Sequence, residues 1–304
     1  MFKTGLVGNV PGPIFKSIFS HPGFTITGCF SQKPNNQRPD NKSTGHMPVL
    51  SKEILLERSD VLIFEKADIY TLDILSDALK QSRHILLIDA SGLPSGVIDE
   101  LIKLREEAQT VFKIMQFERS RPELTSCLPL MNYPSLIEIK LGQKVAEGPG
   151  KNKVITGTLF RIIDILLLLN SSNIKKIQAL QQPERLASGN LISSRVEFDN
   201  GTVANLLYTN IAEKDSLLID IYQLNKHIRI DLLKNKFQSK ERSQLNNEIH
   251  SKTNTFKTTN NQVFYSELDN LYQSIINNNA SGKELYDISR ILELRSRIIE
   301  KSGF

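Results

Sequence analysis

The sequence predicts an α/β protein in which a doubly wound parallel sheet is followed by an α+β domain with an open, mostly antiparallel sheet. Two observations carry this prediction. Over residues 1–120, short apolar runs alternate with helical segments, which is the rhythm of a parallel sheet with crossover helices. Over residues 121–304 that rhythm gives way, and the consecutive strands at 195–233 have connections too short for crossovers, so these strands must run antiparallel.

The first domain is expected to follow a regular order of strand, helix and strand. The chain begins with an apolar run that ends at Gly8, and helical spacing of apolar residues at 14–19 precedes the next run. These elements span about 30 residues, the size of one βαβ unit. A polar segment with proline and glycine at 35–47 is predicted to be a surface loop. The expected strands are 4–8, 24–30, 60–64, 84–89 and 111–117, and the expected helices are 13–20, 72–81 and 97–109.

The second domain is expected to begin near Arg121 and Pro122, where the alternation stops. Asn200-Gly201 is the strongest hairpin signal in the chain, because this dipeptide fits a two-residue turn between strands. The segment 234–261 is polar and rich in Lys, Asn, Ser and Thr, and we expect a mobile excursion there. Ser281 is expected to cap the last helix, and the two closing helices can pack on the first domain. The other expected elements are strands at 135–141, 195–199, 202–209, 216–223 and 227–233, and helices at 156–170, 262–278 and 283–302.

The composition favours a cytoplasmic protein that binds a small molecule. The formal charge is +5, but 38 basic residues are scattered among 33 acidic ones without a basic, aromatic-rich run, so no nucleic-acid partner is expected. Cys29 and Cys127 lie in apolar stretches, which argues against a disulfide and against a thiolate metal site. The first residues have the pattern of a strand, so secretion is not expected. The most apolar window, 162–169, is too short to span a bilayer, so no membrane association is expected.

The turn after the first strand is where a dinucleotide would place its pyrophosphate. Such a turn needs glycines, as in G-x-G-x-x-G, so that backbone N–H groups and the helix N-terminus can approach the phosphates. Only the first glycine is in register here, Val10 puts a branched side chain at the point of close approach, and two prolines remove N–H donors. The segment is either a modified cofactor loop or a tight structural turn. Its sequence is Gly8-Asn9-Val10-Pro11-Gly12-Pro13.

The end of the second strand bears on the choice of cofactor. A carboxylate about 20 positions after the glycines would bind the ribose hydroxyls of NAD, but Ser31, Gln32 and Lys33 stand there. Ser31 and Lys33 can hold a 2′-phosphate instead, which slightly favours NADP over NAD. The alternative is that Lys33 is simply a solvated lysine at a strand end.

In order and spacing, these elements resemble the Gfo/Idh/MocA oxidoreductases, the family of glucose-fructose oxidoreductase and the inositol dehydrogenases. The resemblance covers nearly the whole chain and includes Gly-Leu-Val-Gly at 5–8, Phe-Glu-Arg-Ser-Arg-Pro at 117–122, Val-Glu-Phe-Asp-Asn-Gly at 196–201 and the closing helices. It implies a Rossmann domain that binds NAD or NADP, and a sugar, polyol or similar small molecule as substrate. It also implies a homodimer or homotetramer, because such families use the second sheet for dimerisation and as the floor of the substrate cleft.

Other residues stand where the family carries its lysine and its Thr-Pro pair. The family's Glu-Lys-Pro motif after the fourth strand corresponds to Ile88-Asp89-Ala90, so the lysine is absent. Asp89 can act as a base or can cap the loop, but it cannot supply positive charge to a developing alkoxide. The Thr-Pro pair after the third strand is replaced by Phe64-Glu65-Lys66-Ala67-Asp68, in which Lys66 offers a cation outside the family's catalytic position.

The family's helix histidine, three residues before an aspartate, is replaced by Arg161 ahead of Asp164. Arginine, with a pKa above about 12, cannot shuttle protons near neutral pH, although it can bind a carboxylate or phosphate through two hydrogen bonds. A local ion pair between Arg161 and Asp164 is the structural alternative. The five histidines show no metal-binding spacing, and no nucleophile with a partnering base stands out.

Two hypotheses about function therefore remain open. In the first, the protein is an NAD(P)-dependent oxidoreductase with a divergent cofactor loop at 8–12 and catalytic candidates Asp164, Arg161 and Asp89. In the second, it is a non-catalytic descendant of such enzymes, either a scaffold or a protein that binds an anionic metabolite through Arg161. Resemblance favours the first, and the missing lysine, histidine and glycines favour the second, because each such loss alone costs an enzyme orders of magnitude in rate.

Overall fold

The computed structural model describes residues 1–31, 47–144, 151–181, 191–243, 248–257, 259–279 and 283–302. The chain forms two compact units, one of residues 1–117 with 259–292 and one of residues 118–258 with 293–304. The first contains a five-stranded parallel sheet and the second an eight-stranded, mostly antiparallel sheet, which confirms the expected fold class. The first boundary falls after Phe117, and the chain returns to the first unit near its end.

The sheet of the first unit has the strand order of a doubly wound fold. Its order is β2-β1-β3-β4-β5. On the outer side of β2, a single parallel bridge joins Cys29 to Val49. In many doubly wound sheets a full strand lies at this outer position; here it is reduced to one residue pair. The strands are β1 (Phe2–Val7), β2 (Phe24–Phe30), β3 (Val61–Lys66), β4 (His84–Asp89) and β5 (Phe112–Ile114).

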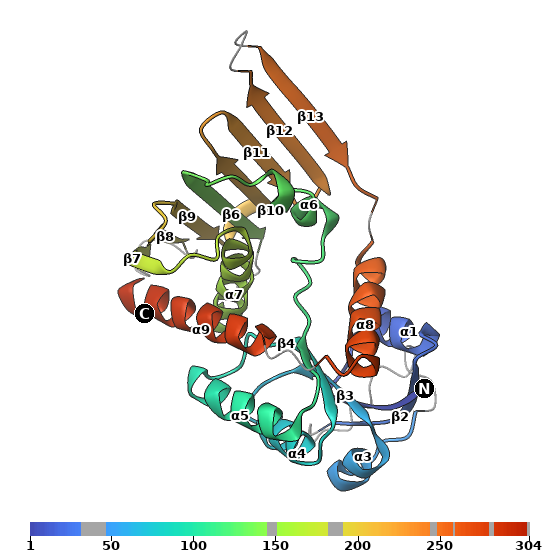
Figure 1. The fold of residues 1–304 in the computed structure, drawn as a ribbon. Coiled ribbons are helices and arrows are strands. Elements are labelled where there is room, and N and C mark those ends of the chain that lie inside the picture. The colour runs from blue at the N-terminus through green and yellow to red at the C-terminus, as the bar shows by residue number, and fades with distance from the viewer. Residues whose placement is uncertain are drawn as a thin grey trace. The chain divides into compact units, whose positions relative to one another are not determined.

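Helices cover both faces of this sheet (Figure 1). α1 (Gly12–Ser20) and α8 (Asn260–Ile276) pack together on one face, and α3 (Lys52–Arg58), α4 (Leu72–Lys80) and α5 (Ile98–Ala108) lie on the other. α3 was not expected from the sequence; the Ser51 side chain caps it by accepting a hydrogen bond from the N–H of Ile54. α8 begins with a capping box, in which Thr259 and Gln262 bond each other's backbone N–H groups.

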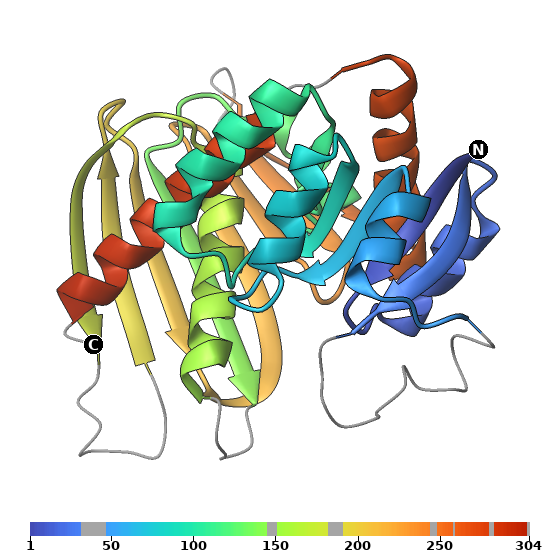
Figure 2. The same ribbon diagram turned by 90° about the horizontal axis from the view of Figure 1, so that it is seen from below.

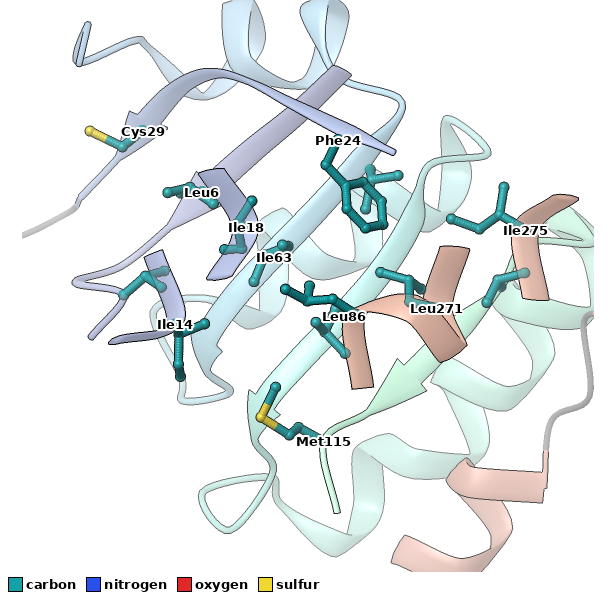
Figure 3. Packing of buried hydrophobic residues seen from close by; sticks show 14 residues of the cluster. Leu6, Ile14, Ile18, Phe24, Cys29, Ile63, Leu86, Met115, Leu271 and Ile275 are labelled. Carbon is teal, nitrogen blue, oxygen red and sulfur yellow. The ribbon is translucent and has the colours of Figure 1, made fainter. Parts of the chain in front are cut away.

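The core of the first unit joins residues from opposite ends of the chain (Figure 3). Leu6 and Ile63 of the sheet pack with Ile14 and Ile18 of α1 and with Leu271 of α8, all at most 2% exposed. Each such side chain contributes about 1.5–3 kcal/mol when fully buried, so α8 is an integral part of this unit.

The second unit is built on strands β6 to β13. β6 (Leu136–Lys144) pairs in parallel with β9 (Val203–Thr209), and every other pair in this sheet is antiparallel. α7 (Lys151–Leu169) lies along one face of the sheet and packs on β6 and β9 (Figure 2). The Asn200-Gly201 hairpin is confirmed, since it joins β8 to β9 with Gly201 at φ +84°. The remaining strands up to β11 are β7 (Ile174–Gln181), β8 (Leu191–Phe198), β10 (Ile211–Tyr222) and β11 (Lys226–Asp231).

The expectation of a mobile excursion at 234–261 is wrong for the described part of that segment, which excludes 244–247 and 258. β12 (Lys236–Arg242) and β13 (Ile249–Thr255) form an antiparallel pair that extends the sheet beyond β11. Phe237 of β12 is buried, whereas the far end of β12 and most of β13 carry exposed side chains, and the two strands pair through their backbones. Composition failed as a guide here because backbone pairing next to an existing strand does not require apolar side chains.

The remaining elements connect and close the two units. α6 (Pro122–Thr125) follows the first boundary, and short 3₁₀ turns lie at Ser95–Val97 and Leu128–Leu130. α9 (Lys283–Ser302) ends the chain and contributes residues to both units. The expected cap Ser281 and most of the expected loop at 35–47 lie outside the described residues. In the described ranges, none of the helices has the length and apolar character that crossing a membrane requires.

Candidate functional site

The turn between β1 and α1 is positioned by two parallel strand pairs. Val7 is in register with Phe30 of β2 and with Phe64 of β3, so Gly8 emerges between the carboxyl ends of both neighbours. The N–H of Gly8 donates to the carbonyl of Phe30 over 2.9 Å. Gly8 has φ +94°, a left-handed conformation that favours glycine.

The carboxylate of Glu65 lies on this turn. Its Oε2 accepts a hydrogen bond of 2.6 Å from the N–H of Asn9. A Cβ atom added to Gly8 would lie 2.7 Å from the same oxygen and 2.9 Å from the Cβ of Glu65. The missing side chain at Gly8 therefore makes room for Glu65, as well as for the backbone conformation. The sequence did not predict this contact because 56 residues separate Glu65 from Asn9. The register of β1 and β3, which pairs Val7 with Phe64, would have indicated that Glu65 lies beside the turn.

Val10 does not obstruct the turn as the sequence suggested. Its side chain is 6% exposed and belongs to the apolar core with Ile14 and Met115. α1 then starts at Gly12, with Pro11 as N-cap and no side-chain cap. The limits on anion binding at this turn are therefore the occupied N–H of Asn9 and the prolines, which have no N–H.

The other predicted cofactor residues lie at the end of β2. Ser31 follows Phe30 directly and is half-buried. Lys33 lies outside the described residues. The choice between NAD and NADP therefore stays a prediction.

The ends of β3 and β4 carry a charged group of side chains beside the turn. Lys66 Nζ lies 3.0 Å from Asp68 Oδ2, and the hydrogen bond with Asp68 raises the pKa of Lys66 above its ordinary value. Lys66 therefore stays protonated near neutral pH and is unsuited to proton transfer. Asp89 is exposed, and its Oδ1 accepts the N–H of Ser91 at 2.8 Å, a loop-capping geometry.

The two predicted residues of α7 make ion pairs with the segment that opens the second unit. Arg161 donates through Nε and Nη2 to Oε1 of Glu118. Asp164, 5% exposed, accepts from Nε of Arg119 over 2.7 Å. The segment 118–121 was expected only as a domain crossing, and its charged side chains were not expected at this site.

These ion pairs belong to a charged cluster that we define as Glu118, Arg119, Arg121, Glu123, Arg161 and Asp164. Arg121 lies 3.6 Å from Glu118 and 3.6 Å from the fully buried Glu123, and it donates to the carbonyl of Leu232 and to Oδ1 of Asn235. Three guanidinium groups thus face three carboxylates. An anionic ligand at Arg161 would have to compete with Glu118, whose charge is nearly buried.

The turn with its strand ends lies in the first unit, and the charged cluster lies in the second. Within the described ranges, no group of three or more His, Cys, Asp or Glu side chains is arranged to hold a metal ion. A cavity of about 510 Å³ lies between α1 and α8, but none of the predicted site residues lines it. The turn in the first unit and the charged cluster in the second are therefore two separate candidate sites.

The fold matches solved dehydrogenases over the whole chain. UDP-N-acetylglucosamine 3-dehydrogenase from Acidithiobacillus ferrooxidans has a TM-score of 0.85 and 16% identity, with 99% of this chain and 97% of that chain covered. Biliverdin reductase from Synechocystis, in complex with biliverdin and NADP+, has a TM-score of 0.80 and 12% identity, with 99% of each chain covered. Levoglucosan dehydrogenase, in complex with NADH, has a TM-score of 0.81 and 11% identity, with 99% and 96% covered.

No family model matches the sequence, and no curated protein matches it significantly. The structural neighbours are dehydrogenases of the Gfo/Idh/MocA type. The resemblance expected from the sequence is thus confirmed at the level of the fold.

Proposed function

We propose that the protein is a cytoplasmic NAD(P)-dependent oxidoreductase, because it shares its fold with dehydrogenases over 99% of its length. Its substrate is a sugar, a polyol or a similar small molecule, and it assembles as a homodimer or homotetramer. The observation that carries the proposal is the joint match of both units to enzymes solved with NADP+ or NADH. A parallel sheet alone would support only nucleotide binding.

The cofactor site of the proposal is the turn at 8–12 with the end of β2. Ligands of open parallel sheets bind at the carboxyl ends of the strands, where the strand order reverses, and β1 ends at that point in this sheet. Gly8, Asn9, Val10 and Gly12 would contact the pyrophosphate through their backbone. Ser31 and Lys33 would contact the adenosine ribose or its 2′-phosphate, which is the reason to expect a slight preference for NADP.

In the proposed reaction, side chains of this protein accept the proton of the substrate. The nicotinamide, when bound, supplies the hydride acceptor or donor. Asp164 is the proposed proton acceptor for a substrate hydroxyl, with Asp89 as the alternative. Arg161 would donate hydrogen bonds that orient the substrate after separation from Glu118.

A second function is favoured by the ion pairs themselves. Arg161 and Asp164 are already engaged with Glu118 and Arg119, and the N–H of Asn9 is engaged with Glu65. A non-catalytic scaffold would tolerate such pairs, whereas an enzyme must break them. The alternative is therefore a protein that retains the fold without turnover, or one that binds an anionic metabolite.

The test is titration of purified protein with NADH and NADPH, followed by nucleotide fluorescence and by thermal shift. We expect saturable binding that is lost in Gly8→Trp, since a side chain there collides with Glu65 and strains a positive φ. Gly96→Trp is the matched control, because a Cβ at Gly96 meets nothing within 4 Å. Circular dichroism verifies that both variants fold.

The same titration separates the cofactors and the two functions. Lys33→Ala is expected to weaken NADPH binding while leaving NADH binding unchanged. Turnover is then followed at 340 nm with NAD+ or NADP+ and UDP-N-acetylglucosamine, free hexoses and polyols. Absence of binding at millimolar nucleotide rejects the oxidoreductase, whereas binding without turnover of any of these substrates favours the non-catalytic alternative.

A further inference from the structure

We propose that the carboxylate of Glu65 occupies the position on the turn that a cofactor phosphate would take, so that a dinucleotide has to displace Glu65 in order to bind. This inference rests on the proposed function and identifies the residue that sets cofactor affinity. In the protein without cofactor, the negatively charged Glu65 side chain takes the place of the cofactor phosphate.

The turn offers few backbone N–H groups to a phosphate. Residues 8–13 have four N–H groups, because Pro11 and Pro13 have none. The N–H of Gly8 is held by Phe30 and the N–H of Asn9 by Glu65. The Gly8 donor stays with Phe30 whether or not Glu65 moves, so Glu65 takes one of the three other donors, and a pyrophosphate that binds without displacing it meets only the N–H groups of Val10 and Gly12.

The geometry of Glu65 carries the second step. Its Oε2 lies 2.6 Å from the nitrogen of Asn9 and would lie 2.7 Å from a Cβ at Gly8. Contact at both residues places the carboxylate over the turn, on the side where glycine leaves space. A phosphate oxygen that bonds the same N–H would overlap this carboxylate, because one N–H directs its hydrogen to one strong acceptor.

Charge carries the third step. The ends of β3 and β4 hold the carboxylates of Glu65, Asp68 and Asp89 against the single ammonium of Lys66, which is hydrogen-bonded to Asp68. The edge beside the turn is therefore net negative among these four groups. The pyrophosphate of a dinucleotide brings two further negative charges, and like charges in contact oppose binding.

Two substitutions separate the charge from the hydrogen bond. Glu65→Gln keeps an acceptor for Asn9 and removes the charge, whereas Glu65→Ala removes both. Asp60→Asn is the matched control: Asp60 Oδ2 accepts the N–H of Lys3 over 2.9 Å at the opposite end of the same sheet. It makes the same change in net charge and weakens the same kind of bond away from the turn.

The binding experiment measures dissociation constants of all four proteins for NADH, NADPH and inorganic pyrophosphate. For each ligand, we expect dissociation constants at least about tenfold lower for Glu65→Gln and Glu65→Ala than for wild type, which is equivalent to about 1.4 kcal/mol. The dissociation constants of Asp60→Asn should equal those of wild type. Equal or weaker binding in both Glu65 variants overturns the inference while leaving the proposed function intact. Binding by the variants alone supports the inference and rejects the wild-type protein as a cofactor enzyme. No binding by any protein overturns both.

A second measurement is independent of any ligand. The amide resonance of Asn9 in a ¹H–¹⁵N spectrum reports its hydrogen bond, and its hydrogen exchange reports how firmly the bond is closed. In Glu65→Ala we expect an upfield shift of the Asn9 proton and faster exchange, with the Lys3 amide unaffected. An unchanged Asn9 amide overturns the inference, whatever the nucleotides do.

Discussion

At the scale of single residues, Asp220 shows how a buried charge is held on the second sheet. Its carboxylate, 4% exposed, accepts hydrogen bonds from Nε of Arg229 at 2.7 Å and Nε2 of His227 at 2.8 Å. Burial raises the pKa of Asp220, but the bonds from Arg229 and His227 outweigh burial and leave this pKa below its usual value. The stabilisation is therefore present above the unfolded pKa of about 3.9 and is lost as the pH falls through the folded value.

We expect Asp220→Asn to lower the free energy of unfolding by about 2 kcal/mol at pH 7, since the hydrogen bonds from Arg229 and His227 lose their charged acceptor. The difference from wild type should shrink between about pH 5 and about pH 2. Urea titrations at several pH values measure both effects. Glu197→Gln on β8 is the control, because its pair with Arg195 is partly exposed and contributes under about 0.5 kcal/mol. An Asp220 effect independent of pH contradicts the ion-pair account.

At the scale of elements, the β8–β9 hairpin depends on one backbone conformation. Gly201 has φ +84°, and a Cβ there would meet nothing within 4 Å. Gly201→Ala is therefore expected to cost about 1 kcal/mol through conformation alone. Gly96→Ala, equally open and without a positive φ, should be neutral or slightly stabilising. Thermal and urea unfolding compare the two, and equal effects would show that the turn tolerates another conformation.

α8 provides the second prediction about elements. Leu271 is fully buried on α8, whereas Ile276 at the end of the same helix is 53% exposed. Leu271→Ala should destabilise the protein by about 3 kcal/mol, because it leaves a cavity against α1 and the sheet, and Ile276→Ala should cost under about 1 kcal/mol. Hydrogen exchange should also accelerate in β1 and β3 of the Leu271 variant. Exchange that accelerates only in the second unit would contradict the place of α8 in the first core.

At the scale of the whole molecule, the proposed assembly is the property to measure. The resemblance implies association through the second sheet, and one face of an antiparallel sheet commonly remains available when helices cover the other. Size-exclusion chromatography with light scattering should give a mass of two or four times the 34.4 kDa of the chain. A monomer at micromolar concentration rejects this part of the proposal.

Periodicity was sufficient for most of the fold. β2, β4 and α9 lie where the sequence placed them, because buried parallel strands and long amphipathic helices carry strong local patterns. α3, β7 and the β12–β13 pair were missed. α3 is a single short helix, and the strands have mixed or polar sequences that pair because a neighbouring ladder offers them backbone partners.

The sequence by itself determined the order of most elements, the parallel first sheet and mostly antiparallel second sheet, and the residues that stand where the resembled family carries its lysine and histidine. Only the tertiary structure decided what surrounds the remaining candidates. Glu65 meets Asn9, Glu118 meets Arg161 and Arg119 meets Asp164 across separations of about 43 to 56 residues. Local patterns specify elements because neighbouring residues share a helix or a strand, whereas these contacts exist only once strand register and helix docking bring distant segments together.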